Sequence, residues 1–432
     1  MYLQRTLEDK LKYLFDNYQK PILLSGSRQV GKTTLIKKCL ENYDSIYINL
    51  AEDTYGINDI FQSGNRLDIE TILEEISDKT NREITNETII FVDEIQQNYI
   101  AFSSLKAFNE SKKCKIICSG SNVGPLLFSD PKVLYPVGQF TSLHLHPFSF
   151  EEFLLATGNK YYVDKLLKSL LEKNISSTLH EELLKLFDIY LRIGGLPSVI
   201  KKYVNEEDYK LEQKELFANY VGDFSKYADK KDIVYLKKIY SEIPAFLGTE
   251  KQIFNLNKLG RASLYTDAVN WIELSRMAIK CNKISTIKRP LSTNASPTKF
   301  KLFLNDTGLL LNILDYDIDL LLRQVDKIYT GVICENYLAT VLKKYTDDLM
   351  FYDDGSKEVD FLFQYNQKIF AIEVKASTNV KSKALSVLID QYQDISSYKI
   401  SRKNLEFSKF DYLPFYAVDM ILDHKIKGYF NY

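Results

Sequence analysis

Short runs of apolar residues alternate with helix-like stretches over the first 150 residues. Five of these runs have the length of buried strands and cover residues 22–24, 45–50, 88–92, 115–118 and 141–146. Before the first run, apolar residues recur every three or four positions from Leu7 to Phe15, which predicts a helix that Pro21 ends. Helical stretches lie between most of the runs. This alternation predicts an α/β domain with a mainly parallel sheet.

The pattern becomes helical after Phe150 and stays so to about Lys230, with one break at Gly194-Gly195-Leu196-Pro197. Three helices and a β-ribbon are predicted next, and together they have the outline of a winged helix. The helices are expected at Asp232–Ile243, at Asn255–Gly260 and from Ser263 or Thr266 to about Lys280, and the ribbon at Lys283–Lys301.

Helices and strands mix again in the last hundred residues. We expect a helix at 331–345, strands at 349–352, 359–364 and 368–374, and a helix around Leu385 and Leu388. These patterns divide the chain into an α/β core (1–150), a helical region (151–230), a winged-helix-like region (231–303) and a C-terminal α/β domain (304–432).

Charge and cysteine content exclude several classes of protein. The 432 residues include 56 basic and 57 acidic ones, so nucleic acid could be bound only through a local basic patch. The five cysteines lack zinc-finger spacing and indicate reduced thiols in the cytoplasm. The charged N-terminus does not resemble a signal peptide, and no apolar run approaches the roughly 18 residues of a membrane-spanning helix. No membrane partner is therefore expected.

The first candidate site is a glycine-containing loop after the first predicted strand. It fits the pattern G-x-x-x-x-G-K-[ST], in which the backbone N–H groups cradle phosphates. Lys32 would reach the β- and γ-phosphates, Thr33 would bind Mg²⁺, and the helix that follows would add its positive N-terminal end. The expected ATP-binding residues are Gly26, Ser27, Arg28, Gln29, Val30, Gly31, Lys32, Thr33 and Thr34.

A pair of acidic residues follows the buried strand at 88–92. Asp93 would hold Mg²⁺ together with Thr33, and Glu94 would orient or activate the attacking water as the catalytic residue. The acidic pair favours ATP hydrolysis over the switch of a small GTPase, and the chain has no N-K-x-D motif for reading guanine.

A third group of polar residues follows the strand at 115–118. Ser119, Ser121 and Asn122 are candidates for sensing the γ-phosphate at this strand end. An ordinary strand-to-turn connection would give the same pattern.

The ordered set of motifs resembles the bacterial and archaeal AAA-type ATP-binding proteins. In the first half, the resemblance rests on residues 26–33, 93–96, 119–121, 147–153 and 194–197. Members with a C-terminal domain of unknown function also match at residues 305–309, Gly331, 335–336, 358–361 and 373–375. The resemblance implies a P-loop ATPase core, a helical and winged-helix middle, and a C-terminal fold like that of restriction endonucleases.

One position departs from the family. Members often have Gly-Arg where this chain has Gly138-Gln139, so an arginine finger or γ-phosphate sensor at this point would be missing. Arg192, just before the break in the helical region, could substitute for it.

The C-terminal domain contains carboxylates with the spacing of a PD-(D/E)xK nuclease core. Alternate residues of a strand share a face, so a hairpin at 365–367 would bring Asp360, Glu373 and Lys375 together, and Glu335 could add a ligand. Such a site could bind a second Mg²⁺ or Mn²⁺ for phosphodiester hydrolysis. Solvated ion pairs on an exposed strand would have the same sequence pattern.

These observations lead to two functional hypotheses. The first is a Mg²⁺-dependent ATPase coupled to DNA-associated action through the nuclease-like domain. The basic residues that could contact DNA are Lys283, Lys288, Arg289, Lys299 and Lys301, although a solvated hairpin or a domain contact would also explain them. The second is a nucleotide-dependent switch with slow hydrolysis and an inert C-terminal domain, which acts on a protein partner or as a homo-oligomer.

Overall fold

The computed structural model forms two compact units, each described here by itself. The N-terminal unit contains residues 2–146 and 274–276, and the C-terminal unit contains residues 147–273 and 277–432. The structure describes residues 2–62, 68–121, 123–124, 136, 138–227, 230–249, 252–256, 262–315, 327–376, 383–392, 395–408 and 410–427.

The N-terminal unit is built on a parallel five-stranded sheet with the strand order β2-β3-β4-β1-β5. The strands are β1 (Ile22–Ser25), β2 (Ser45–Asn49), β3 (Ile89–Asp93), β4 (Lys115–Gly120) and β5 (Thr141–His144). The helices are α1 (Glu8–Asn17), α2 (Lys32–Cys39), α3 (Asn58–Gln62), α4 (Ile69–Thr80), α5 (Tyr99–Ser103) and α6 (Leu105–Ser111), with 3₁₀ turns η1 (Thr54–Gly56) and η2 (Ile95–Gln97). All five predicted strands and the parallel sheet are thus confirmed.

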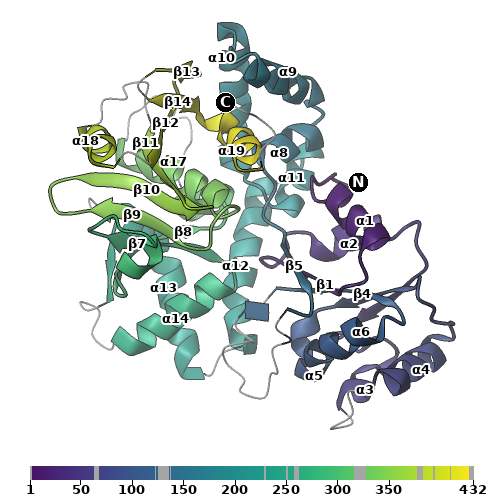
Figure 1. Cartoon of the computed structure of the whole chain (residues 1–432). Coiled ribbons are helices and arrows are strands. Elements are labelled where there is room, and N and C mark those ends of the chain that lie inside the picture. The colour runs from purple at the N-terminus through teal and green to yellow at the C-terminus, as the bar shows by residue number, and fades with distance from the viewer. Residues whose placement is uncertain are drawn as a thin grey trace. The chain divides into compact units, whose positions relative to one another are not determined.

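Helices cover both faces of this sheet (Figure 1). Alternate residues of a strand point to opposite faces, so Ile90 and Val92 pack with α3 to α6, whereas Ile89 and Phe91 pack with α1 and α2. β3 is buried along its whole length as a central strand. This burial fixes the strand end that carries Asp93 and Glu94.

The C-terminal unit begins with helices and continues into a mixed sheet. Its first helices are α8 (Phe150–Ala156), α9 (Lys160–Leu171), α10 (Ser177–Ile193), α11 (Pro197–Val204), α12 (Tyr209–Tyr227), α13 (Lys230–Leu247) and α14 (Ala262–Leu274). The later ones are α15 (Thr307–Ile313), α17 (Lys327–Leu342), α18 (Lys383–Gln391) and α19 (Val418–Lys427), with 3₁₀ turns η4 (Leu291–Asn294) and η5 (Phe415–Ala417). The predicted helical stretch after Phe150, with its break at 194–197, is confirmed.

In the described part of this unit, nine strands form one sheet with the order β13-β14-β12-β11-β10-β9-β7-β8-β6. They are β6 (Phe254–Asn255), β7 (Ala278–Ile284), β8 (Lys299–Leu304), β9 (Leu349–Asp353), β10 (Glu358–Tyr365), β11 (Lys368–Lys375), β12 (Ile395–Ser401), β13 (Glu406–Phe407) and β14 (Asp411–Pro414). β9, β10 and β11 are antiparallel neighbours, whereas β12 lies parallel to β11. The predicted strands and helix after residue 331 are confirmed.

The ribbon of the predicted winged helix belongs to this larger sheet. β7 pairs with β8 on one side and with β9 on the other, so strands from residues 231–303 and from 304–432 form one sheet. The third predicted helix does not reach Lys280, because Arg276 has a left-handed φ of 57° and the strand β7 begins at Ala278. Asn255, expected to begin a helix, lies in β6, and residues 257–260 lie outside the described part of the chain. The winged-helix fold and the four-part domain division stay predictions.

None of the helices in the described part of the chain has the length and apolar character needed to cross a membrane.

Candidate functional site

The loop between β1 and α2 has the shape that its glycines permit. Gly31 has a φ of 99°, a left-handed value that non-glycine residues rarely adopt, and α2 begins directly after it. A side chain at Gly26 would collide with the carbonyl oxygen of Leu145. The Ser27 hydroxyl is buried and has no hydrogen-bond partner among the described residues, so a polar group is available inside the loop.

Lys32 lies inside this loop. Its ammonium group donates hydrogen bonds to the carbonyl oxygens of Gly26 (3.0 Å) and Ser27 (2.9 Å). Burial lowers the pKa of Lys32 to about 8, although Glu94 and Asp93 oppose the shift. Burial in the loop therefore disfavours the charged form of Lys32, and the two carboxylates partly offset this effect.

Thr33 and Asp93 meet at the first turn of α2. The Thr33 hydroxyl donates a hydrogen bond of 2.7 Å to Asp93 Oδ2. A hydroxyl and a carboxylate are oxygen ligands of the kind that Mg²⁺ prefers, and Mg²⁺ commonly takes its other ligands from water and phosphate. The residues present thus fit a magnesium ion bound together with a nucleotide.

Two further residues hold the Asp93 carboxylate. Tyr47 donates to Oδ2 at 3.2 Å, and Ser119 donates to Oδ1 in a short hydrogen bond. Burial and the Asp93 charge raise the pKa of Tyr47 to about 12, so the phenol remains a donor at neutral pH. The sequence analysis missed Tyr47, because its place beside Asp93 depends on the parallel register in which Asn49 pairs with Asp93.

Glu94 directly follows β3 in a left-handed conformation, with a φ of 56°. Its backbone N–H donates to Asp93 Oδ1 at 3.1 Å, and its carboxylate accepts a short hydrogen bond from the side-chain amide of Gln96. The amide oxygen of Gln96 packs against Gly120, where a Cβ atom would lie 2.5 Å from it. Gln96 was quoted only within the family motif, yet it links Glu94 to the end of β4.

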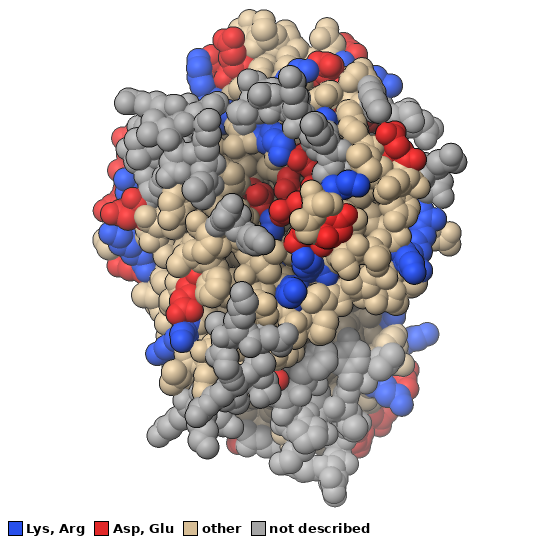
Figure 2. Space-filling view, turned by 90° about the vertical axis from the view of Figure 1, so that its left-hand side faces the viewer, with Lys and Arg blue, Asp and Glu red and all other residues tan. Residues whose placement is uncertain are grey.

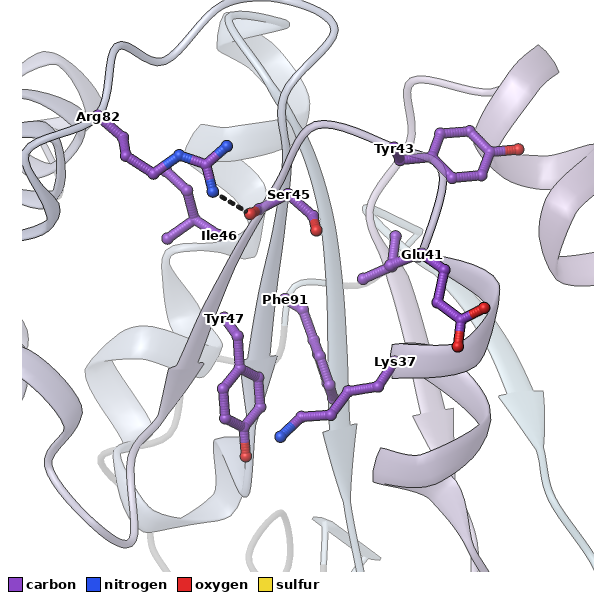
Figure 3. Close-up of a pocket in the computed structure, with 9 residues that line it drawn as sticks. Lys37, Glu41, Tyr43, Ser45, Ile46, Tyr47, Arg82 and Phe91 are labelled. Carbon is purple, nitrogen blue, oxygen red and sulfur yellow. Dashed lines mark hydrogen bonds between the residues drawn. The ribbon is translucent and has the colours of Figure 1, made fainter. Parts of the chain in front are cut away.

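A cavity of about 330 Å³ lies beside this site (Figure 3). It is lined by residues of α2, of β2 and of the segment between them, and by Arg82 and Phe91, and none of its lining residues belongs to the phosphate-binding loop. Tyr47 forms one wall, with the Lys37 ammonium 3.6 Å from the centre of its ring. Tyr47 therefore connects the cavity with Asp93.

The residues predicted to sense the γ-phosphate lie in different surroundings. Ser119 contacts Asp93 directly, and Ser121 is buried at the end of β4, whereas Asn122 lies outside the described residues. Gln139 accepts a hydrogen bond of 2.7 Å from Asn109 of α6. Arg192 is in α10 of the C-terminal unit, and its role as a substitute sensor stays a prediction.

In the C-terminal unit, the structure contains the predicted hairpin. β10 and β11 are antiparallel, with Tyr365 opposite Lys368 and Phe361 opposite Ile372. Asp360 Oδ2 accepts a 2.6 Å hydrogen bond from the Val374 N–H group. Lys375 lies 2.6 Å from Glu373, and its charge and that of Asp360 influence each other.

A lysine from a different part of the chain completes this cluster. Lys301 of β8 contacts Glu335 of α17 at 3.2 Å and Glu358 of β10 at 3.1 Å. Burial alone would lower the pKa of Lys301, but the neighbouring carboxylates outweigh it and hold that pKa above its ordinary value. Burial raises the pKa of Glu335, against the attraction of Lys301. The sequence analysis named Lys301 among the basic residues that could contact DNA, with a domain contact as an alternative, and its two ion pairs and 3% exposure favour the domain contact.

Figure 2 faces the side of β9 and β10, where acidic side chains gather in a hollow with basic side chains at its margin. Among the described residues, no three His, Cys, Asp or Glu side chains are placed to hold a metal ion. The second metal ion expected in this domain is therefore not shown.

The remaining basic residues of the ribbon have mixed surroundings. Lys283 forms an ion pair with Asp353 of β9, whereas Lys288, Arg289 and Lys299 are exposed. Only part of the predicted basic patch is therefore open to solvent.

Two glycine motifs of the sequence meet at a buried carboxylate. Asp306 accepts hydrogen bonds from the N–H groups of Gly195 (2.6 Å) and Leu309 (3.0 Å), and burial raises its pKa to about 6. A side chain at Gly194 would collide with Asp306, and one at Gly308 with the backbone of Ile193. These motifs therefore form a packed junction within the C-terminal unit.

Three family models match the chain. Residues 18–154 match an AAA domain. Residues 184–319 and 330–416 match two domains of unknown function, DUF8612 and DUF4143. No match to a curated protein was found.

Several solved structures are similar to the chain. The Walker-type ATPase of Pyrococcus abyssi is 15% identical, with 72% of this chain and 96% of that chain covered and a TM-score of 0.43. The Aeropyrum pernix ORC2 protein, in its ADPNP–ADP complexes, is 16% identical, with 75% and 96% covered and a TM-score of 0.35. Both scores are below 0.5, so the assignment rests on the family model. Residues 18–154 are therefore similar to an AAA domain, which supports nucleotide binding and hydrolysis.

Proposed function

We propose that this chain binds ATP in the loop at residues 26–34 and hydrolyses it with Mg²⁺. The observation that carries this proposal is the 2.7 Å contact between Thr33 and Asp93, directly beside the loop that holds Lys32. The AAA domain match over the same residues supports it.

Each residue has a role that follows from its position. Lys32 exchanges its bonds to the loop carbonyls for phosphate oxygens, and the backbone N–H groups of the loop hold the same phosphates. Thr33 and Asp93 would hold the magnesium ion, which when bound neutralises charge on the phosphates. Glu94 orients the attacking water and accepts its proton, because it directly follows Asp93 and its backbone N–H group binds the Asp93 carboxylate.

Two variants test these roles separately. Lys32→Ala should abolish ATP binding, whereas Glu94→Gln should keep ATP binding and lose turnover. Lys38→Ala is a matched control in the same helix, since Lys38 pairs with Glu41 on the surface. Unaltered turnover in Glu94→Gln, with intact binding, would show that another group activates the water.

We also propose that nucleotide state controls an action of the C-terminal unit. The exposed Lys288 and Arg289 support DNA as the target, and reversing both charges should then weaken DNA binding and its salt dependence. The alternative is a protein partner, or a second copy of the chain, bound in a nucleotide-dependent way.

One assay separates these targets. DNA should stimulate ATP turnover if the first is correct. No response to DNA, together with partner binding that requires ATP, would favour the second. In both cases the five buried free thiols support a reducing, cytoplasmic location.

For the nuclease-like site, we propose DNA cleavage that depends on Mg²⁺ or Mn²⁺. Asp360→Ala should abolish this cleavage. A wild-type chain that cuts no DNA or RNA with either ion would leave the inert alternative. The Lys301 ammonium, which already pairs with Glu335 and Glu358, favours a catalytically inert C-terminal domain.

A further inference from the structure

Four carboxylates lie together at β10 and β11 and have the residue types of a divalent-metal centre, but all four are already engaged by other groups of the protein. They belong to Glu335, Glu358, Asp360 and Glu373. Mg²⁺ requires ligand oxygens at about 2.0–2.1 Å in nearly octahedral geometry. Here Glu335 and Glu358 both contact Lys301, Glu373 contacts Lys375, and Asp360 accepts a backbone hydrogen bond. Each of the four carboxylates already has a donor from the protein. The residues present therefore do not fit a divalent ion without rearrangement.

Lys301 is also held in place by its strand and by burial of its side chain. It belongs to β8, which pairs with β7 on one side and β6 on the other. Its side chain is 3% exposed, and its ammonium lies 5.1 Å from the centre of the Phe351 ring. Withdrawing this ammonium would leave Glu335, itself largely buried, beside other carboxylates without a counter-charge, which is strongly unfavourable.

We propose that Lys301 is the resident cation of this cluster and takes the place that a divalent ion would have in a nuclease. It joins α17, β8 and β10 through its two ion pairs. The cluster then keeps the arrangement of a nuclease site while acting as a structural connection. The proposal does not depend on ATP hydrolysis by residues 26–34.

A direct consequence concerns the charge of the cluster. Four carboxylates and the two ammonium groups of Lys301 and Lys375 leave a formal charge of −2. Removing the Lys301 ammonium lowers this charge to −3 and frees an oxygen on Glu335 and one on Glu358. A cluster of this kind becomes a site for a divalent cation.

Binding of Mn²⁺ alone, followed by electron paramagnetic resonance on the full chain, tests this proposal. All variants carry Asp93→Asn, which removes the carboxylate among the two expected metal ligands of the N-terminal unit. We expect the Asp93→Asn chain and its Asp360→Asn derivative to bind Mn²⁺ equally weakly. Adding Lys301→Met, which keeps most of the apolar stem, should increase Mn²⁺ affinity at least tenfold, and Asp360→Asn should remove the gain.

Two outcomes would overturn the proposal. The first is Mn²⁺ binding by the Asp93→Asn chain that Asp360→Asn abolishes, since the cluster would then accept metal despite Lys301. The second is a folded Lys301→Met chain with no gain in Mn²⁺ affinity. The first comparison needs no substitution at Lys301, so it decides the matter even if Lys301→Met does not fold.

Discussion

The Tyr47 hydroxyl lies 3.2 Å from Asp93 Oδ2, the same oxygen that accepts a hydrogen bond from Thr33. Tyr47 comes from β2, one of the two edge strands of the sheet, and its ring also forms a wall of the neighbouring cavity. The carboxylate expected to bind Mg²⁺ is therefore oriented by a side chain that lies outside the phosphate-binding motifs.

Replacing Tyr47 by Phe should weaken Mg²⁺ binding. The change removes one donor to Asp93 and keeps the ring that packs beside Phe91. A lost hydrogen bond of this kind costs about 1 kcal/mol, or about fivefold in affinity. The measurement is the Mg²⁺ concentration that gives half-maximal ATP turnover. Tyr43→Phe, which removes a hydroxyl bound to Asp16 at the same cavity, should leave it unchanged.

ATP affinity should fall as the pH rises above 8. Burial lowers the pKa of Lys32 to about 8, so in the free protein its ammonium loses its proton from that pH upward. ATP requires the ammonium, and the affinity should decrease by up to about tenfold per pH unit. Titration with a fluorescent ATP analogue between pH 7 and 9.5 measures this.

The lowered pKa of Lys32 should also change the stability of the fold with pH, in the direction opposite to the change in ATP affinity. Between pH 8 and the ordinary Lys pKa of 10.5, the unfolded chain binds more protons at Lys32 than the folded chain does. The Lys32 contribution to the free energy of unfolding should therefore rise with pH in this window. If ATP affinity and stability rise together above pH 8, this description of Lys32 is wrong.

The sequence predicts most elements of both units, because their periodicity is a local property. The five strands of the N-terminal unit and the hairpin that pairs Asp360 with the β11 strand were found in this way. The ribbon after Arg276 was misjudged for a physical reason. A local pattern predicts a strand, but it does not show that β7 has β9 as a partner more than sixty residues later.

The same limit applies to the sites. Lys32, Thr33 and Asp93 follow motifs with fixed spacing, and their meeting could be predicted from a strand-loop-helix context. Tyr47 and Lys301 reach their partners through strand register and tertiary packing, which composition and spacing do not encode. Lys301 in particular was grouped with exposed basic residues, because nothing in its local sequence indicates three carboxylates nearby.

Gln96→Ala should slow ATP turnover without changing ATP binding. Its amide donates to the Glu94 carboxylate, so its loss leaves the water-orienting group less well positioned. We expect kcat to fall about tenfold, less than the roughly hundredfold or greater effect of losing a general base itself, while the Kd for ATP stays the same. Gln97→Ala, at the exposed neighbouring position, is the control. Equal losses in kcat and ATP affinity would indicate a packing role for Gln96 instead.

Gly194→Ala should destabilise the C-terminal unit far more than Gly158→Ala. Both glycines have positive φ, 80° and 77°, so each alanine carries a backbone cost of about 1–2 kcal/mol. At Gly158 the new Cβ would have no described atom within 4 Å, whereas at Gly194 it would collide with the Asp306 carboxylate. Moving Asp306 would weaken its buried hydrogen bonds to Gly195 and Leu309, which adds about 1–3 kcal/mol. Urea unfolding followed by tryptophan fluorescence of Trp271 should show the difference, and equal losses of stability would contradict the junction.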